Sequence, residues 1–593
     1  MARPLRQLDD EVIERPFNKN QFFRLLKYLH PYKKDVGLAL LVMTAATFAS
    51  LGSPYLMSRA VGMLESGAFG GIWLILLAMA ALAALGALFT RFRVRLMDYA
   101  GRKALATLRE DLFAHIQSLS FSFFDTTSAG KILVRVVNDV DALNDLFTNG
   151  IVDVLINALT VILLLGIMLV VNWQLTLIGL SILPVLLFLM FRFKRVMSKN
   201  WQFVRTKRSN MNGYLHEALS GMRVTQFFVR EEVNAQMFEG ANDEIRTGWM
   251  RAIRYNAGFW SSLDVTGTIG TVLVYFFGVR FMGTGLQLAD LLLVLWYLNR
   301  IWMPLNTLSN FYNSLLTASA SMERIFGIMD EVPRVKDQED AKVLPAIRGQ
   351  VDFEHVSFAY NQDKQVLQDV SLHIKPGQTV ALVGETGAGK TTIVNLISRF
   401  YDVTAGRILV DGQDIREVTL NSLRSQMSVM QQDSFTFSGT IMDNIRYGRL
   451  EATDEEVMAA ARAVGAEAFI LNMPKGYQTE VSERGTSLST GQKQLVSFAR
   501  ALLNDPRILI LDEATSSIDT RTEMAIQKAL QVLLQHRTSF VIAHRLSTIR
   551  NADLILVVED GRIAEQGSHE ELIRLPGGHY RALCEAQARF MQS

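Results

Sequence analysis

A glycine-rich turn followed by a lysine and a threonine has the residue types and spacing that do the clearest chemistry in this chain. Residues 384–391 read Gly-Glu-Thr-Gly-Ala-Gly-Lys-Thr; the apolar run 380–383 precedes them, and a helix-like segment, 392–397, follows. A strand, a glycine-rich turn and a helix in this order form a P-loop, in which backbone N–H groups and the helix N-terminus face phosphates. The pattern predicts a nucleoside triphosphate site.

Two polar residues of this turn have an expected chemical role. We expect Lys390 to reach the β- and γ-phosphates and the Thr391 hydroxyl to ligate Mg²⁺. A glycine-rich turn without a ligand is the alternative, and the flanking strand and helix disfavour it. The predicted phosphate-binding set is Gly384, Glu385, Thr386, Gly387, Ala388, Gly389, Lys390, Thr391 and Thr392.

Two adjacent carboxylates form a second candidate site about 120 residues later. Residues 508–511 are four apolar residues that predict a buried strand, and Asp512 and Glu513 stand at its end. One carboxylate can bind Mg²⁺, and the second can position and polarise an attacking water. We assign Asp512 to the metal and Glu513 to the water.

The first half of the chain predicts a helical membrane domain. Of the 593 residues 49% are hydrophobic, and these are concentrated in the first 320 positions. Six apolar runs are each long enough, at roughly 20 residues, to cross a hydrocarbon core of ~30 Å. They lie near 36–58, 71–90, 149–171, 174–191, 259–281 and 286–307.

Charge sets the expected orientation of these spans. The long segments 91–148 and 192–258 are rich in Lys and Arg, whereas the short loops between the other spans have almost none. Basic residues remain on the cytoplasmic side, so both long loops and both termini are expected in the cytoplasm. Basic residues interleaved with aromatics in 1–35 predict an amphipathic helix on the membrane surface, with an ordinary solvated helix as the alternative.

Both long loops have a helical pattern and predict helices that leave the membrane and turn back. The expected turns are the Phe-rich segment 121–130 and a segment near 214–221. An exposed Phe-rich turn needs a covering partner, and the nucleotide-binding half is available. Asp264 lies within the fifth run and is either functional or simply hydrated, while Asp290 is expected at the membrane interface.

Composition excludes several classes of protein. The net charge of +2 gives no indication of a nucleic-acid partner. One cysteine, Cys584, excludes an intrachain disulfide framework. The polar start of the sequence predicts no cleavable signal peptide.

The second half predicts an α/β domain with a β-rich subregion. Polar residues with two prolines, within 326–349, indicate a linker, and short β-rich runs that alternate with helical patterns begin near 351. The expected organisation is an N-terminal elbow (1–35), a transmembrane domain (36–325), the linker (326–349) and a nucleotide-binding domain (350–593).

The segment Leu-Ser-Thr-Gly-Gln at 488–492 resembles the Leu-Ser-Gly-Gly-Gln signature of the ATP-binding-cassette (ABC) superfamily. This resemblance implies ATP as the nucleotide and Mg²⁺ as its metal. It also implies ATP-contacting roles for Ser489, Gly491 and Gln492. Glu483-Arg484-Gly485 resembles the short loop that precedes the signature in exporters. One six-span domain followed by one cassette is the half-transporter layout of ABC exporters, so the resemblance covers the whole chain.

The same resemblance assigns further residues by their motifs. Tyr360 matches the aromatic residue that stacks on adenine, and Gln432 the loop glutamine that touches Mg²⁺ and senses the membrane half. Asp519 matches the D-loop aspartate. His544 matches the switch histidine that contacts the γ-phosphate. The implied catalytic set is Glu513, His544, Lys390 and Gln432, and the implied metal ligands are Thr391, Gln432 and Asp512.

The family places each ATP between one P-loop and the signature of a second chain, so the resemblance implies a dimer. Thr490 departs from the pattern, because a β-branched residue stands where the family has its first glycine. Heterodimeric exporters characteristically combine a degenerate signature with an intact glutamate and histidine in one chain. This favours a partner half-transporter that lacks the Walker B glutamate, with a homodimer as the alternative.

The expected function is ATP-driven export of hydrophobic or amphipathic compounds, as in multidrug exporters, from a bacterial cell membrane. A homodimeric lipid or lipopeptide exporter has the same layout. A channel or regulator gated by ATP is the alternative from another class, and the intact Glu513 disfavours it. The six spans exclude a soluble ABC ATPase. The expected partners are a second half-transporter chain, the lipid bilayer and a small-molecule substrate, without nucleic acid.

Overall fold

The computed structural model describes residues 18–282, 286–360, 365–431, 434–482, 488–513, 520–543 and 549–592. The chain forms two compact units. Unit 1 comprises Met1–Ile116 and Gly130–Asp330, and unit 2 comprises Gln117–Ala129 and Glu331–Ser593. The segment 117–129 therefore packs with the P-loop unit, although the helical half of the sequence supplies it.

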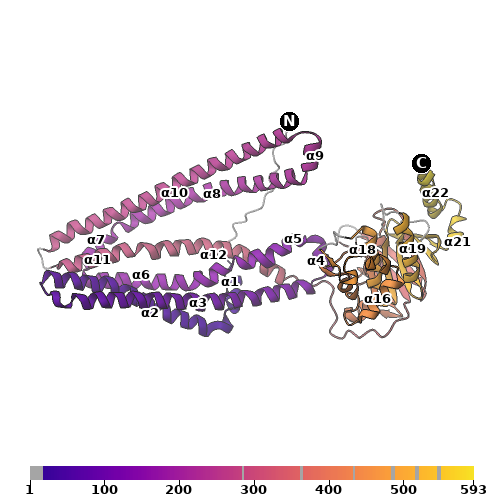
Figure 1. Cartoon of the computed structure of the whole chain (residues 1–593), viewed down its shortest axis with the longest axis horizontal. Coiled ribbons are helices and arrows are strands. Elements are labelled where there is room, and N and C mark those ends of the chain that lie inside the picture. Colours follow the sequence, from indigo (N-terminus) through magenta and orange to yellow (C-terminus); the bar gives the residue numbers. More distant parts are fainter. Residues whose placement is uncertain are drawn as a thin grey trace. The chain divides into compact units, whose positions relative to one another are not determined.

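Unit 1 is built of long helices, in which apolar runs continue directly into amphipathic stretches (Figure 1). Its main helices are α1 (Lys19–Lys27), α2 (Lys33–Glu65), α3 (Ile72–Ser118), α5 (Ala129–Val134), α6 (Ile151–Val171), α7 (Trp173–Leu180), α8 (Leu183–Ser220), α9 (Met222–Phe227), α10 (Glu231–Met282), α11 (Leu288–Arg300) and α12 (Trp302–Met329).

The prediction of six membrane spans is confirmed by length and composition within the described residues. The candidate spans are His30–Glu65, Phe69–Ser118, Val152–Val171, Trp173–Ser220, Glu231–Met282 and Leu288–Leu305. Two spans contain a break that the hydropathy pattern does not show: residues 181–182 separate α7 from α8, and Ile301 separates α11 from α12. Proline next to the first break, Pro184, lacks the backbone N–H that would continue the helix.

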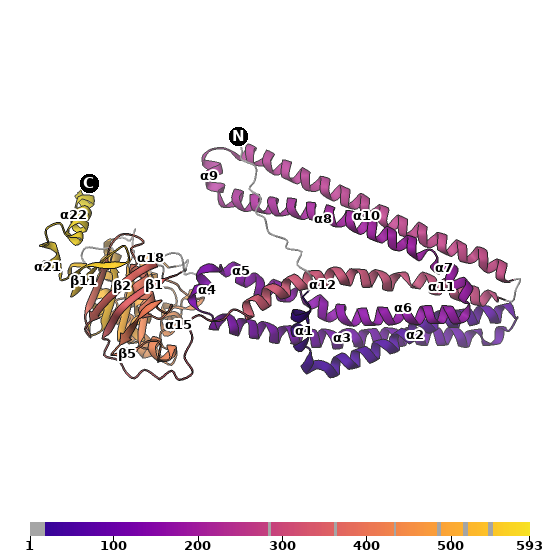
Figure 2. The ribbon, with the colours of Figure 1, turned by 180° about the vertical axis from the view of Figure 1, so that it is seen from behind.

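The helices α8 and α10 run side by side over most of their length (Figures 1 and 2). Gly248 permits this close approach, because a Cβ atom there would lie 2.8 Å from the Val204 side chain. The amide of Asn200 donates to the Gly248 carbonyl oxygen at 3.1 Å. The turn expected near 214–221 lies later than predicted, since α8 continues to Ser220 and the chain reverses over 221–230. No residue of 214–220 stops a helix, whereas Gly221 is a C-cap residue.

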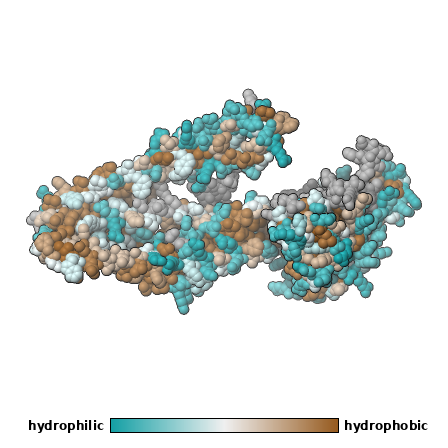
Figure 3. All heavy atoms as spheres, viewed as in Figure 1, coloured by the Kyte–Doolittle hydropathy of each residue, from teal (hydrophilic) through white to brown (hydrophobic). Residues whose placement is uncertain are grey.

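Hydrophobic side chains cover much of the surface of the membrane spans, while the surface of α8 and α10 near α9 is more hydrophilic (Figure 3). Trp73 and Leu77 are 61% exposed on α3. Exposed apolar surface on this scale is the surface that hydrocarbon covers. The amphipathic helix predicted in 1–35 forms as α1, which Asn18 caps; residues 1–17 lie outside the described residues. Its position on a membrane stays a prediction.

Unit 2 confirms the predicted α/β domain with a β-rich subregion (Figure 2). One sheet is antiparallel, in the order β2-β1-β4-β5, and the other has six strands in the order β12-β11-β3-β10-β9-β6. The strands of the first are β1 (Val351–Ala359), β2 (Gln365–Ile374), β4 (Ala405–Val410) and β5 (Gln413–Asp414). Those of the second are β3 (Thr379–Val383), β6 (Met427–Met430), β9 (Ile508–Glu513), β10 (Thr538–Ala543), β11 (Leu554–Glu559) and β12 (Arg562–Gly567).

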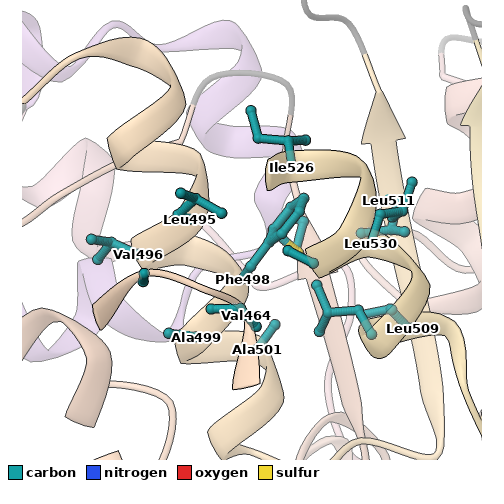
Figure 4. Close-up of a cluster of buried hydrophobic side chains, with 14 of the residues drawn as sticks. Val464, Leu495, Val496, Phe498, Ala499, Ala501, Leu509, Leu511, Ile526 and Leu530 are labelled. Carbon is teal, nitrogen blue, oxygen red and sulfur yellow. The ribbon is translucent and has the colours of Figure 1, made fainter. Parts of the chain in front are cut away.

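Five helices of unit 2 matter for the site. They are α4 (Phe121–Thr126), α13 (Lys390–Ile397), α15 (Ile441–Arg446), α18 (Thr490–Leu503) and α19 (Thr520–Leu534). Phe498 of α18 points into a buried apolar cluster with Leu511 of β9 and Leu530 of α19 (Figure 4). This packing anchors the helix of the signature segment to β9, the strand that carries Asp512 and Glu513.

Candidate nucleotide-binding site

Four parallel strands bring the predicted site residues to one edge of the six-stranded sheet. The strands β3, β10, β9 and β6 are adjacent and parallel, so their carboxyl ends lie at the same edge. In the register of these strands Ile542 pairs with Leu382 on one side and with Asp512 on the other. The P-loop, which follows β3, and the carboxylates at the end of β9 therefore face the same region.

The P-loop has a backbone that only glycine adopts without strain. Gly384 has φ +146°, and a Cβ atom there would lie 2.2 Å from the Val558 carbonyl oxygen. Gly389 has φ +113° and is the N-cap residue of α13. The loop therefore ends at a helix N-terminus whose free N–H groups and dipole attract an anion.

Lys390 is the first residue of α13 and is only 8% exposed. Its ammonium group donates to the carbonyl oxygens of Gly384, at 2.8 Å, and of Glu385, at 2.7 Å. Burial lowers the pKa of Lys390 below its ordinary value of 10.5, and the negative charge of Asp512 opposes this shift. A cation held inside an arc of backbone is placed for the phosphate groups of a nucleotide.

Tyr360 lies beside the P-loop helix at the end of β1. Its hydroxyl is 3.1 Å from the hydroxyl of Thr392, which is buried on α13. Tyr360 is 37% exposed. An accessible aromatic face next to a phosphate-binding loop can stack on a nucleotide base.

The signature segment forms the start of α18. Ser489 caps the helix in a reciprocal pair with Gln492: the Ser489 side chain accepts from the Gln492 N–H at 3.3 Å, and the Gln492 side chain accepts from the Ser489 N–H at 2.9 Å. Thr490 is the first helical residue and its side chain is exposed, whereas Gly491 is buried. Since Thr490 has a helical backbone, it differs from glycine there by its side chain alone.

Several predicted site residues lie outside the described part of the chain. These are Gln432, Asp519 and His544, together with the exporter loop Glu483-Arg484-Gly485. For Glu513 the backbone is described as the last residue of β9, and the side chain is not. The strands that lead to Gln432 and His544, β6 and β10, end at the site edge of the sheet.

The described metal-ligand candidates fit a magnesium site that a nucleotide completes. Thr391 is exposed beside the P-loop lysine, and Asp512 is partly buried at the end of β9. Within the described residues no group of three His, Cys, Asp or Glu side chains could hold a metal by itself. Mg²⁺ characteristically takes one or two protein oxygens and shares the remaining positions between phosphate and water.

Arg500 is a site-supporting residue that the motifs did not indicate. It lies on α18, and its guanidinium donates to the Asn444 carbonyl oxygen at 2.8 Å and to the Phe435 carbonyl oxygen at 3.1 Å. It also lies over the rings of Phe437 and Tyr447, at 5.8 and 5.6 Å from their centroids. Arg500 therefore joins the helix of the signature segment to the chain that follows Gln432.

The predicted covering of the Phe-rich turn by the nucleotide-binding half is observed within unit 2. Phe121 of α4 stacks on Phe400 with ring centroids 5.0 Å apart. The Ser120 hydroxyl accepts a 2.8 Å hydrogen bond from the N–H of Val335. The chain enters this unit from α3, so α4 joins a membrane-spanning helix to the nucleotide-binding fold.

Two family models match the two halves of the sequence. The ABC transporter transmembrane region matches residues 36–305, and the ABC transporter domain matches residues 367–516. The uncharacterized ABC transporter ATP-binding protein YknV of Bacillus subtilis is 45% identical over 98% of this chain and 96% of its own length. These matches cover both the spans and the candidate site.

Other relatives have names that state a substrate. A fatty acid ABC transporter ATP-binding/permease protein of Mycobacterium bovis is 40% identical over 84% of this chain and 79% of its own length. The Bacillus subtilis protein YgaD, whose name proposes multidrug export, is 37% identical over 93% of this chain and 96% of its own length. Among solved structures, a bacterial Atm1-family ABC exporter with ATP bound is similar, with a TM-score of 0.76 and 31% identity over 94% of this chain and 98% of that chain.

Proposed function

Because this chain belongs to the ABC transporter family, as a membrane half-transporter whose cytoplasmic ATPase domain is coupled to transport, we propose that it exports hydrophobic or amphipathic compounds as one subunit of a heterodimer. The observation that supports the heterodimer is Thr490, at the first turn of α18. A second chain is required in either case, because one chain supplies one P-loop and one signature.

In this proposal the competent ATP site lies on this chain's P-loop and is closed by the partner's signature. Tyr360 stacks on adenine, and Lys390 binds the β- and γ-phosphates. Glu513 positions and polarises the attacking water, and His544 contacts the γ-phosphate. Thr391, Asp512 and Gln432 would hold Mg²⁺, which when bound neutralises phosphate charge.

The second ATP site of the proposed dimer uses this chain's signature. Ser489, Gly491 and Gln492 would face the partner's nucleotide, with Asp519 beside them. The side chain of Thr490 stands where the backbone of a signature glycine comes close to the γ-phosphate, so it would alter this contact. Hydrolysis in the second site would therefore be slow. Because the partner's Walker B glutamate serves that slow site, the partner can lack it.

The proposed substrates are apolar or cationic amphiphiles, because the spans contain few charged residues. Asp264 lies on α10 with an exposed side chain, and a carboxylate in lipid is costly. Facing a polar cavity of the assembled transporter removes this cost and gives a cation a partner. A lipid exporter is the second candidate, and the fatty acid transporter among the relatives favours it.

Transport into inverted membrane vesicles tests the function. We expect ATP-dependent uptake of a fluorescent amphiphilic cation against its gradient, and loss of uptake in Glu513→Gln vesicles. A channel would equilibrate the cation without accumulation, so ATP-dependent flux that stops at equal concentrations would contradict export.

ATP turnover of the purified complex tests the asymmetry. Glu513→Gln should abolish nearly all turnover, because it removes the water-positioning group of the single competent site. Thr490→Gly, which restores the usual signature, should change turnover less than about twofold. A large gain with Thr490→Gly, or substantial turnover in Glu513→Gln, would contradict a single competent site.

A further inference from the structure

Tyr401 lies between the candidate adenine-stacking residue and the helix that comes from the membrane domain. Its ring meets the ring of Tyr360 edge to face, with centroids 5.0 Å apart and an interplanar angle of 89°. Phe358 contacts both rings, at 4.9 Å from Tyr360 and 5.6 Å from Tyr401. Three aromatic rings in mutual contact cannot move independently, because each fills the space beside the others.

The other side of Tyr401 contacts α4. The Tyr401 hydroxyl donates a hydrogen bond to the carboxylate of Asp125, and its ring lies 6.5 Å from that of Phe121, at 86°. Phe121 in turn stacks on Phe400. One helical turn of α4 is thus held by an aromatic stack and by one charge-assisted hydrogen bond.

Two arginines, Arg424 and Arg399, hold the Phe400-Tyr401 segment in position. The Arg424 guanidinium lies 5.2 Å from the Phe400 ring centroid and donates to the carbonyl oxygen of Arg399 at 2.8 Å. Arg399 is 1% exposed and donates to the carboxylate of Asp402 at 3.0 Å. Since both neighbours of the Phe400-Tyr401 pair are held, the pair has little freedom to follow α4 without moving the adjacent backbone.

The charges agree with a hydroxyl donor and a carboxylate acceptor. Burial, followed by the hydrogen bond and negative charge of Asp125, raises the pKa of Tyr401 well above its usual range. The Tyr401 hydroxyl therefore keeps its proton and is the donor of this hydrogen bond. The exposed Asp125 carboxylate has a donor here that Phe at position 401 would not supply.

We propose that Tyr401 is a positioning residue that links adenine stacked on Tyr360 to the placement of α4, through its ring contact with Tyr360 and its hydrogen bond to Asp125. The link rests on the proposed function, since it assumes that Tyr360 stacks on adenine. A base on Tyr360 restricts that ring, the restricted ring fixes Tyr401, and Tyr401 holds Asp125. The position of α4 then depends on the base of the nucleotide as well as on its phosphates.

Hydrogen exchange of the intact transporter complex tests this link. The complex in nanodiscs is compared without nucleotide, with ATP and with CTP, each at saturation and with EDTA to prevent turnover. We expect ATP to slow amide exchange in 117–129 by about tenfold, as the ordering of one charge-assisted hydrogen bond allows. CTP, whose smaller base stacks less on Tyr360, should slow it clearly less.

Three substitutions are compared in this experiment. Tyr401→Phe should retain ATP binding and lose most of the protection of 117–129, and Asp125→Asn should weaken it in the same direction. Tyr477→Phe is the matched control, because Tyr477 is a buried tyrosine of the same unit whose hydroxyl contacts no hydrogen-bonding partner among the described residues. It should leave the protection unchanged.

The outcomes distinguish the proposed role of Tyr401 from the proposed function of the transporter. Equal protection in Tyr401→Phe and in the native chain, or equal protection by ATP and CTP, would overturn the link while vesicle transport stands. Failure of the native complex to bind ATP would overturn both. Base-dependent protection that disappears in Tyr401→Phe with ATP affinity unchanged would support the link, since a purely structural tyrosine would not give a base-dependent effect.

Discussion

The Lys390 ammonium group donates a 2.8 Å hydrogen bond to the carbonyl oxygen of Gly384, so the lysine at the end of the P-loop holds the residue at its beginning. The same cation also contacts the carbonyl oxygen of Glu385 at 2.7 Å. The loop is therefore closed by its own lysine. When a nucleotide binds, its charged phosphate oxygens replace these neutral carbonyl oxygens as acceptors for the lysine. Phosphate oxygens bind an ammonium group more strongly.

The first prediction concerns the two kinds of glycine in this loop. Gly384→Ala should lower the free energy of unfolding of the nucleotide-binding domain by about 3 kcal/mol or more, because its Cβ atom would lie 2.2 Å from the Val558 carbonyl oxygen. Gly387→Ala is the matched control: φ is +88°, but nothing lies within 4 Å of the added atom. Its cost should be only about 1–2 kcal/mol. Thermal unfolding of both variants in detergent measures the difference, and equal losses would contradict it.

The second prediction is a pH dependence of ATP affinity. Burial lowers the pKa of Lys390 below 10.5, and only the charged lysine binds phosphate strongly. The pKa of Lys390 is lower in the folded state than in the unfolded state, so between these two pKa values the unfolded chain binds more protons. The destabilisation caused by burying the charged Lys390 therefore diminishes as pH rises through the window from the lower to the higher pKa. ATP affinity should fall over the same window, beginning below the ordinary lysine pKa.

Titration of a fluorescent ATP analogue from about pH 7 to about pH 10 checks this decline. The nucleotide phosphates are already ionised over the upper part of this range, so a loss of affinity there reports on the protein. Affinity that stays constant until the ordinary pKa of lysine would contradict the predicted shift.

The third prediction concerns Arg500, which holds the chain after Gln432 against α18. Arg500→Gln removes the guanidinium group that donates hydrogen bonds to the carbonyl oxygens of Asn444 and Phe435. The cost should be about 2–3 kcal/mol of unfolding free energy, because the carbonyl oxygen of Asn444, a residue only 2% exposed, loses a charged donor. Arg449→Gln breaks an exposed ion pair with Glu456 and should leave the unfolding temperature unchanged. Thermal unfolding of both variants measures this contrast, and equal effects of the two changes would show that Arg500 has no special role.

The fourth prediction addresses the substrate. Asp264→Asn should raise the KM for transport of a monocationic amphiphile by about tenfold, and leave that of a neutral analogue unchanged, because one carboxylate charge is lost. Asp290→Asn is the matched control, since Asp290 stands in the first turn of α11, where a carboxylate complements the helix dipole. Parallel uptake assays in inverted vesicles provide both values. An equal effect on the cation and on the neutral compound would exclude a charge-binding role for Asp264.

The sequence predicted the parts of the fold that a strong local pattern determines. Six apolar runs predicted six spans, and the apolar run 380–383 lies within β3. It placed the turn after α8 too early, because nothing in 214–220 distinguishes a helix that ends from one that continues. The breaks within the fourth and sixth runs were not foreseen, because apolar composition persists across them.

The sequence likewise predicted some residues of the candidate site and missed others. The P-loop was recognisable because its chemistry lies within eight consecutive residues. Tyr401 and Arg500 were missed, since each acts through partners far away in the sequence: Asp125 precedes Tyr401 by 276 residues, and Phe435 precedes Arg500 by 65. Such pairs have no local pattern and become visible only when the chain is folded.

The asymmetric pair proposed from Thr490 is tested most directly by the intact mass of the native complex, purified from its own membrane through a tag on this chain. The account predicts one copy of the 66.5 kDa chain together with one different chain of similar size, whose sequence lacks the glutamate after its Walker B aspartate. A complex of two copies of this chain would contradict it, and Thr490 would then have to serve in both ATP sites.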